Sequence, residues 1–348
     1  MCKKLLSFVM GVYNTPENLL RNCLNSCLEQ KDINIEIVCV NDGSTDNSPK
    51  ILEEYAQKYP TIFKIINQEN KGVGPTKQVG IQHASGKYLW LIDADDRVRP
   101  NCVKSLINAL EAHNADQIIF PFIKAKKSET NSDFPLINEE TIKEVSKEYA
   151  FANFYRAFTK RIIKKEIVEK ANVEIPWSIH EDWPTTIRWT LECNKIIHSN
   201  CAYYMYVEND ASITHRRYYS PEFMKSSIKT LELLHKNISD FPEYTQWMVL
   251  NIIMSAEINL KRVRDSREMQ EAQAPEIQEK FDETEKEYQF WLNRYSEEEK
   301  TLSNFFKNLS TLKHKLKRAN QRISALESSA SWKITAPLRA ILKIFIKH

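Results

Sequence analysis

The first hundred residues alternate short apolar runs with segments of helical spacing, and this alternation is what most limits the possible folds. Four runs of strand length are rich in Val, Ile and Leu: 5–12, 33–40, 63–67 and 88–92. Helical segments are expected between them, around 19–27 and at about 50–58 and 76–84. This order, with nearly continuous apolar strands, is typical of a parallel sheet covered by helices on both faces. We therefore expect a doubly wound α/β sheet.

Two acidic clusters directly follow two of these strand-like runs. Asp42 and Asp46 lie in the turn-rich stretch 41–49, and Asp93-Ala94-Asp95-Asp96 follows 88–92. Ligands of open α/β sheets bind beyond the carboxyl ends of the strands, so both clusters are expected at one edge. Three carboxylates within four residues repel one another, and Mg²⁺ or Mn²⁺ relieves that repulsion. A solvated acidic turn would have the same spacing, so context decides.

The order of several short motifs supplies that context. In chain order they are Val12-Tyr13-Asn14, Val40-Asn41-Asp42-Gly43-Ser44-Thr45-Asp46, Asn70-Lys71-Gly72-Val73-Gly74, Gly80, Gly86-Lys87-Tyr88 and Asp93-Ala94-Asp95-Asp96. This order resembles the family 2 glycosyltransferases of the GT-A fold, closely over about residues 5–110 and more loosely to about 217. The resemblance implies a Rossmann-like, mostly parallel sheet. It also implies an inverting transferase that uses a nucleotide-sugar, with a UDP-hexose or UDP-N-acetylhexosamine as the expected donor.

The resemblance assigns roles on the base side of the nucleotide. Asp42 matches the acid that hydrogen-bonds the base, typically uracil. Val12 and Tyr13 match residues that line the base pocket, and Asn14 lies beside them. The loop that flanks the nucleotide in the family corresponds here to two further residues, Asn70 and Gly72.

The run at 93–96 matches the D-x-D motif of the family. Asp93 and Asp95 correspond to the pair that holds the ribose and the metal ion, with the small Ala94 between them and Asp96 close by. The implied cofactor is Mn²⁺ or Mg²⁺, which would stabilise the diphosphate as it leaves.

The stretch Pro75-Thr76-Lys77-Gln78 departs from the family pattern, which usually has Ala-Arg-Asn here. Lys77 keeps the positive charge but lacks the planar fork of arginine. We expect Lys77 to belong to the nucleotide-binding residues, with contacts that differ in detail from those of the family.

His180-Glu181-Asp182-Trp183 resembles the acidic Glu-Asp motif of the family. An inverting transfer needs a base that removes the acceptor's hydroxyl proton during the attack. Asp182 is the expected base, and Glu181 either positions the acceptor or is itself the base. Trp177 and Trp183 could stack on a sugar ring or anchor the core.

A polar and basic loop follows a tyrosine-rich strand expected at 203–207. In the family, such a loop often folds over the diphosphate. The resemblance makes His215 a candidate metal ligand or diphosphate contact, and Arg216 and Arg217 candidate phosphate contacts.

The C-terminal part has a different organisation. A helical region is expected at 221–300, and an unbroken three-four spacing follows in Leu302, Phe305, Leu309, Leu312, Leu316, Ala319, Ile323 and Leu326. This a/d seam predicts a coiled coil over 301–330 and therefore a homo-oligomer. A helix docked along its own domain is the alternative.

Residues 331–348 combine an apolar face with Arg339, Lys343 and Lys347 at four-residue spacing. This pattern predicts an amphipathic helix on an anionic membrane surface, or else a helix packed into the partner chain of the coiled coil. The segment also resembles the tails of bacterial surface-polysaccharide glycosyltransferases, which implies a glycan or lipid-linked acceptor.

Composition limits localisation and partners. Net charge is only +3, so nucleic acid is not an expected partner. Seven cysteines without paired zinc-ligand spacing indicate reduced thiols. No run of ~18 apolar residues and no signal-peptide pattern occur, so we expect a cytoplasmic protein, peripheral on the inner face of the cytoplasmic membrane.

These observations define five expected parts of the chain. Residues 1–110 would bind the nucleotide-sugar and 111–220 the acceptor, followed by the helical region, the coiled coil and the tail. Two alternative functions remain. A nucleotidyltransferase would also use acidic metal ligands, but it should have a Gly-rich basic loop near residues 8–20. A non-catalytic oligomeric scaffold with a degenerate transferase domain would not need Asp93, Asp95, Glu181 and Asp182.

Overall fold

A computed structural model describes six stretches of the chain: residues 4–31, 33–126, 134–137, 139–154, 157–176 and 181–208. All of them lie in the first of two units into which the chain divides, 1–284 and 285–348. The helical region, coiled coil and tail expected from the sequence lie outside the described residues.

The central element is an eight-stranded sheet with the order β3-β2-β1-β4-β9-β6-β10-β8. Its strands are β1 (Leu6–Val12), β2 (Ile35–Asp42), β3 (Phe63–Gln68), β4 (Tyr88–Leu91), β6 (Gln117–Ile119), β8 (Ile142–Val145), β9 (Arg161–Lys164) and β10 (Ile196–Ser199). Six strands run in one direction, while β9 and β8 are antiparallel to their neighbours. The expected doubly wound, mostly parallel sheet is therefore confirmed.

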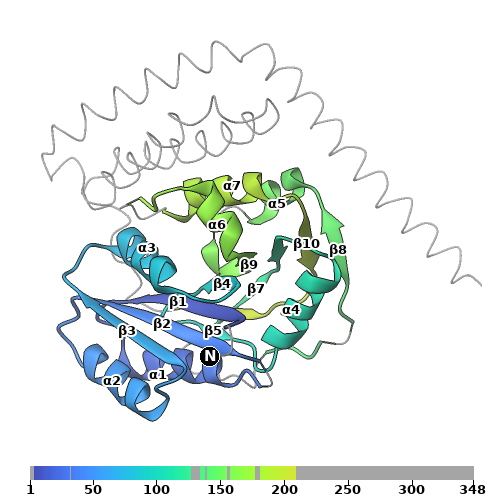
Figure 1. Cartoon of the computed structure of the whole chain (residues 1–348). Coiled ribbons are helices and arrows are strands. Elements are labelled where there is room, and N and C mark those ends of the chain that lie inside the picture. The colour runs from blue at the N-terminus through green and yellow to red at the C-terminus, as the bar shows by residue number, and fades with distance from the viewer. Residues whose placement is uncertain are drawn as a thin grey trace, which may run out of the picture. The chain divides into compact units, whose positions relative to one another are not determined.

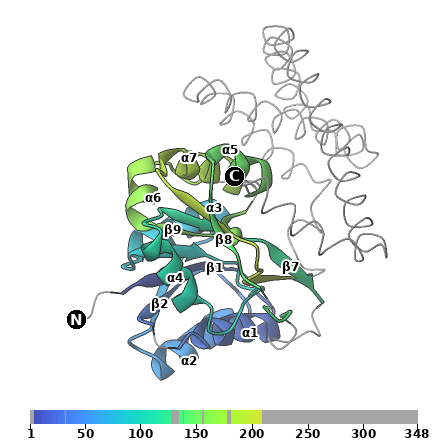
Figure 2. The same cartoon turned by 90° about the vertical axis from the view of Figure 1, so that its right-hand side faces the viewer.

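Helices cover both faces of this sheet (Figures 1 and 2). One face carries α1 (Glu17–Leu28), α2 (Ser48–Lys58) and α4 (Val103–Ala112), and their apolar residues share one buried cluster with β1 and β2. The other face carries α3 (Val73–His83), α5 (Lys147–Phe154), α6 (Lys165–Ala171) and α7 (Asp182–Glu192), with a short 3₁₀ helix, η2 (Phe158–Lys160). Each face thus has its own core.

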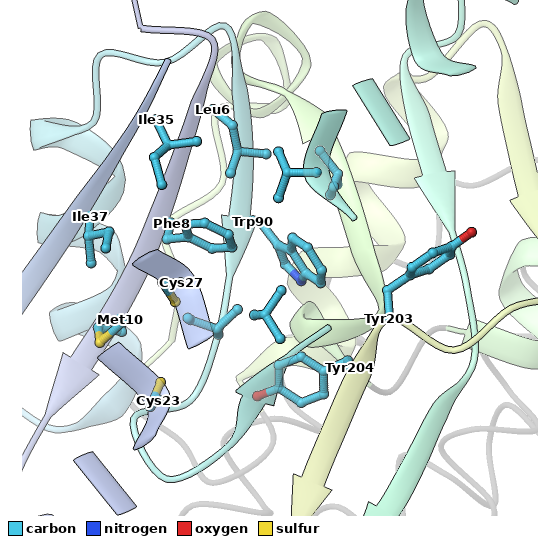
Figure 3. Close-up of a cluster of buried hydrophobic side chains, with 14 of the residues drawn as sticks. Leu6, Phe8, Met10, Cys23, Cys27, Ile35, Ile37, Trp90, Tyr203 and Tyr204 are labelled. Carbon is cyan, nitrogen blue, oxygen red and sulfur yellow. The ribbon is translucent and has the colours of Figure 1, made fainter. Parts of the chain in front are cut away.

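A row of aromatic rings, made by Phe8, Trp90, Phe120 and Tyr203, crosses the core between the two halves of the sheet. Figure 3 shows three of these rings, those of Phe8, Trp90 and Tyr203. The ring centroids of Phe8 and Trp90 are 5.5 Å apart, those of Trp90 and Phe120 5.2 Å, and those of Phe120 and Tyr203 5.3 Å. Offset and edge-to-face pairs at such distances are favourable beyond their buried area. Because Phe8 and Tyr203 are far apart in the chain, this row packs the early strands against the later ones.

A second, three-stranded sheet has the order β5-β11-β7. It consists of β5 (Arg97–Val98), β7 (Phe122–Ala125) and β11 (Tyr204–Val207). Since β5 follows the acidic run at 93–96 directly, this small sheet is joined to the carboxyl end of β4.

The early elements follow the sequence pattern closely, with one correction. Helix α3 begins at Val73, so 73–75 are helical rather than part of the preceding loop. Pro75 fits because a proline in the first turn removes no intrahelical hydrogen bond. Gly72, with φ of 86°, makes the turn into the helix. Among the described residues, no helix is long and apolar enough to cross a membrane.

Candidate functional site

The acidic run at 93–96 turns one carboxylate inward and leaves two partly exposed. The Tyr204 hydroxyl accepts the N–H of Asp93 at 3.1 Å and donates to Asp96 Oδ2 at 2.6 Å. The N–H of Val207 donates to Asp96 Oδ1 at 2.8 Å. Burial, together with the charges of Asp95 and Asp93, raises the pKa of Asp96 despite these bonds. Asp96 therefore fixes the turn, while Asp93 and Asp95 keep partial exposure.

Asp42, the last residue of β2, ties the loop before α3 to the end of that strand. Its Oδ1 accepts from Gln68 Nε2 at 2.7 Å and from the N–H of Lys71 at 2.8 Å. Its Oδ2 accepts from the N–H of Gly72 at 2.9 Å. Gly43 (φ 71°) allows a close approach, because a Cβ there would lie 2.9 Å from the nitrogen of Asn70. The predicted residues Asp42, Asn70 and Gly72 thus come together.

The predicted base-pocket residues lie at the end of β1, beside the end of β2. Val12 is buried and paired in register with Asn41, whereas Tyr13 is 51% exposed. Asn14 has a left-handed φ of 47°, and its side-chain oxygen accepts the N–H of Thr45 at 2.8 Å. These contacts join the two loops that follow β1 and β2.

Lys77 is the buried centre of an ion cluster. Its Nζ lies 3.1 Å from Asp93 Oδ1 and 3.0 Å from Glu181 Oε1, with its side chain only 7% exposed. The ammonium also lies 5.1 Å from the ring centroid of Phe158. Burial opposes the charge, but the carboxylates of Asp93 and Glu181 outweigh it and raise the pKa of Lys77. Lys77 therefore bridges the D-x-D turn and the predicted acidic pair.

Glu181 and Asp182 lie where α7 begins, so the helix dipole favours their negative charge. Burial nevertheless raises the pKa of Glu181, although Lys77 lowers it. Burial and then the charge of Glu181 raise the pKa of Asp182, again against Lys77. Trp183 is buried, so it anchors the start of α7. A carboxylate with a raised pKa is a stronger base than a solvated one.

Two carboxylates at the end of β4 suit the implied metal ion. Mg²⁺ typically uses one or two protein carboxylates together with substrate phosphates and waters, and Mn²⁺ favours the same oxygen ligands. Asp93 and Asp95 supply such a pair, and the side chain of Asp93 is 42% exposed. Within the described ranges, no group of three or more His, Cys, Asp or Glu side chains is gathered as a complete cage.

Some predicted site residues lie outside the described part of the chain, namely Trp177, His215, Arg216 and Arg217. Sequence reasoning missed other contributors. Tyr204 was assigned only to a strand, and the amide of Gln68 on Asp42 was not foreseen. Phe158 beside Lys77 was not foreseen either. The tyrosine-rich sequence of 203–206 was the one available signal.

Comparisons with known proteins identify the family of the chain. The family model for glycosyl transferase family 2 matches residues 7–171. Glycosyltransferase GlyG of Streptococcus pneumoniae serotype 4 is 30% identical over 250 residues, 68% of this chain and 80% of that protein. The putative glycosyltransferase EpsH of Bacillus subtilis is 32% identical over 176 residues, 49% of this chain and 50% of that protein.

Among solved structures, TarS 1–349 of S. aureus in complex with UDP-GlcNAc shares the fold. The TM-score is 0.61 at 20% identity, over 80% of this chain and 79% of that chain. The fold is therefore GT-A, as expected from the order of motifs. Taken with the matches to the family model and to GlyG, these results show that the chain is a glycosyltransferase and belongs to glycosyl transferase family 2.

Proposed function

We propose that the chain transfers a sugar from a UDP-sugar to a hydroxyl of a glycan or lipid-linked acceptor, with inversion, in cell-surface polysaccharide synthesis. The observation that carries this proposal is the Asp93–Lys77–Glu181 bridge, since it joins the D-x-D turn to the acidic pair in one site. In this arrangement, 1–110 bind the donor and 111–220 bind the acceptor.

Uracil is the proposed base because Asp42 suits an imide N–H. Each carboxylate oxygen can accept two hydrogen bonds, and Oδ2 of Asp42 receives one from Gly72. Tyr13, half exposed beside it, offers a ring face, and Val12 and Asn14 complete the pocket. TarS, which shares the fold, has been crystallised with UDP-GlcNAc. We therefore propose a UDP-hexose or UDP-N-acetylhexosamine as donor.

Asp95 and Asp93 would hold Mn²⁺ or Mg²⁺ together with the diphosphate, and Asp93 and Ala94 would also contact the ribose. When bound, the cation supplies charge neutralisation for the leaving diphosphate. The protein holds these two carboxylates at the end of β4. The Tyr204 hydroxyl fixes the turn that carries them, because it accepts the N–H of Asp93 and donates to Asp96.

Asp182 is the proposed base. Its carboxylate takes the proton of the acceptor hydroxyl while that oxygen attacks the anomeric carbon, and the bond to the nucleotide breaks on the opposite side. Direct displacement of this kind inverts the anomeric centre. Burial supports the assignment, because a raised pKa lets the carboxylate accept the proton more readily near neutral pH. Glu181, fixed by Lys77, would orient the acceptor.

His215, Arg216 and Arg217 are proposed as diphosphate or metal contacts. Val207, whose N–H binds Asp96, lies eight residues before His215. An extended chain of eight residues spans at most about 26–29 Å, so the loop can reach the donor. The seam at 301–330 and the basic tail at 331–348 support a homo-oligomer on the inner face of the cytoplasmic membrane.

A screen of nucleotide-sugars for hydrolysis and transfer with Mn²⁺ or Mg²⁺ tests the activity and the donor together. We expect one UDP-sugar to be turned over, and chelation of the metal to stop the reaction. Asp95→Ala and Asp182→Ala should each abolish most transfer, whereas Glu111→Ala, an exposed carboxylate paired with Lys87, should not. Wild-type rates in both site variants would refute the catalytic assignment and favour the scaffold alternative.

Separate measurements test the C-terminal proposals. Light scattering should give an oligomer that is lost without residues 300–348, and a monomer in both cases would refute the coiled coil. Sedimentation with anionic liposomes should depend on residues 331–348, and equal binding without them would refute the membrane proposal.

A further inference from the structure

One face of α3 contacts the chain segment that leads into α7. Gly74, Lys77 and Gln78 share this face because residues three and four apart lie side by side on a helix. Lys77 Nζ lies 3.0 Å from Glu181 Oε1, and Gln78 Oε1 accepts the N–H of Ile175 at 3.2 Å. The contacted residues are Ile175 and Pro176, together with Glu181, which directly precedes the proposed base.

Gly74 shows how close this approach is. A Cβ at this position would overlap the carbonyl oxygen of Pro176. That oxygen belongs to the backbone, so no side-chain rotation could relieve the clash. Any residue larger than glycine would therefore push the segment and α3 apart.

The following turn of α3 is fixed to the strands of the donor half. A Cβ on Gly80 would lie 2.5 Å from Val9 Cγ1, so the helix packs almost directly on β1. Its start is fixed as well, because the N–H of Gly72 donates to Asp42. The helix thus has little freedom to move relative to the carboxyl ends of β1 and β2.

We propose that α3 is a positioning platform, formed by Gly74, Lys77 and Gln78, that sets the start of α7, with Glu181 and the proposed base Asp182, against the donor motif at 93–96. Lys77 is the main positioning residue, since its ammonium contacts both Asp93 and Glu181. This inference rests on the proposed function and deepens it. In this role Lys77 aligns the proposed base with the bound donor and contributes little to nucleotide affinity.

The experiment compares Lys77→Met, Lys77→Arg and Gln78→Leu with the matched control Lys87→Met. Lys87 is a suitable control because it also combines an ion pair at 3.0 Å, with Glu111, and a ring at 5.0 Å, that of Tyr88. It lies at the other end of β4, away from the proposed site. Three quantities are measured for each variant: the kcat of transfer, the Kd of UDP with Mn²⁺, and hydrogen exchange in peptides covering α7.

Lys77→Met should lower kcat about 100-fold, because a displacement of about 1 Å at the reacting groups can cost that much. The Kd of UDP should change less than about fivefold, and exchange at the start of α7 should become faster. Lys77→Arg should restore part of the rate by keeping the charge, and Gln78→Leu should lower kcat about tenfold. Lys87→Met should match the wild type in all three measurements.

Equal losses of UDP affinity and kcat in Lys77→Met would overturn the platform, because Lys77 would then be a nucleotide-binding residue. Unchanged exchange across α7 would also overturn it. A wild-type protein that turns over no nucleotide-sugar would contradict the proposed function instead. In that case hydrogen exchange decides the inference alone: faster exchange in Lys77→Met supports the platform, and unchanged exchange overturns it.

Discussion

Carboxylates are buried at both ends of the central sheet, but their hydrogen bonds and pKa shifts differ. At the amino end, Glu36 receives the Ser7 hydroxyl at 2.5 Å and the N–H of Ser85 at 2.5 Å. The Ser85 hydroxyl at 2.9 Å and the N–H of Gly86 at 3.2 Å complete the set. Burial raises the pKa of Glu36, but these bonds outweigh burial and lower it overall.

At the carboxyl end, Glu181 and Asp182 lie close to each other and to Asp93, and one lysine is shared among them. Burial raises the pKa of both members of the pair, and Lys77 only reduces the rise. Neutral donors thus satisfy a buried carboxylate at one end, whereas at the other its ionised form stays unfavourable. A buried carboxylate whose hydrogen bonds lower its pKa stays ionised and stabilises the fold. A buried carboxylate whose pKa is raised accepts a proton more readily.

The largest expected difference between the two ends is in catalysis. Asp182→Asn should lower the rate of transfer about 10²–10⁴-fold, the usual contribution of a general base. Its thermal stability should not fall, because the change removes a carboxylate that Glu181 repels. Steady-state kinetics and thermal unfolding check both points. A variant that loses stability but keeps its kcat would reverse the comparison.

The next effect concerns stability. Glu36→Gln should lower the free energy of unfolding by about 1–3 kcal/mol, because hydrogen bonds to a buried charge are weakened and an amide hydrogen faces the N–H groups of Ser85 and Gly86. The kcat per folded molecule should stay unchanged. Denaturant unfolding measures the first quantity, with exposed Glu111→Gln as the control. Wild-type stability in Glu36→Gln would show that the two ends are not so different.

The smallest effect is a shift along the pH axis. Transfer requires ionised Asp182, so the rate should be lost as pH falls through the raised pKa, and this limb should lie above the usual aspartate value of about 3.9. Glu181→Gln removes the neighbouring charge that raises the pKa of Asp182, so its limb should move to lower pH. Glu111→Gln should leave the limb in place. A limb that moves upward in Glu181→Gln would contradict the assigned order of causes.

The parts of the fold that could be predicted depend on short-range pattern. Strands β1 to β4 are apolar runs bounded by turn residues, and the position of the acidic run 93–96 beyond β4 follows from parallel topology. Helix α3 begins three residues earlier than the pattern predicts, because Gly74 and Pro75 are typical of loops yet fit a first helical turn. Their reason lies in the tertiary structure, where Gly74 makes room for Pro176.

The contacts that complete the site could not be read from the chain because they join distant residues. Lys77 and Glu181 are 104 positions apart, and Tyr204 and Asp96 are 108. Nothing in the local pattern around Lys77 distinguishes a bridging lysine from one that contacts phosphate. The sequence pattern predicts where the acidic residues lie in the fold. Only the tertiary structure shows that Asp96 points inward while Asp93 and Asp95 remain partly exposed.

The antiparallel strand β9 limits where such chains can be truncated or joined into chimaeras. It lies between β4 and β6, pairing Tyr88 with Lys164 on one side and Ile118 with Ile162 on the other. A fragment ending near residue 110 would leave β4 as an open, apolar edge, which invites association between molecules. The first hundred residues are therefore not expected to fold as an independent, soluble domain. In a chimaera that combines the donor half of this chain with the acceptor half of a relative, residues 161–164 should come from the same protein as β4, the strand with which they pair.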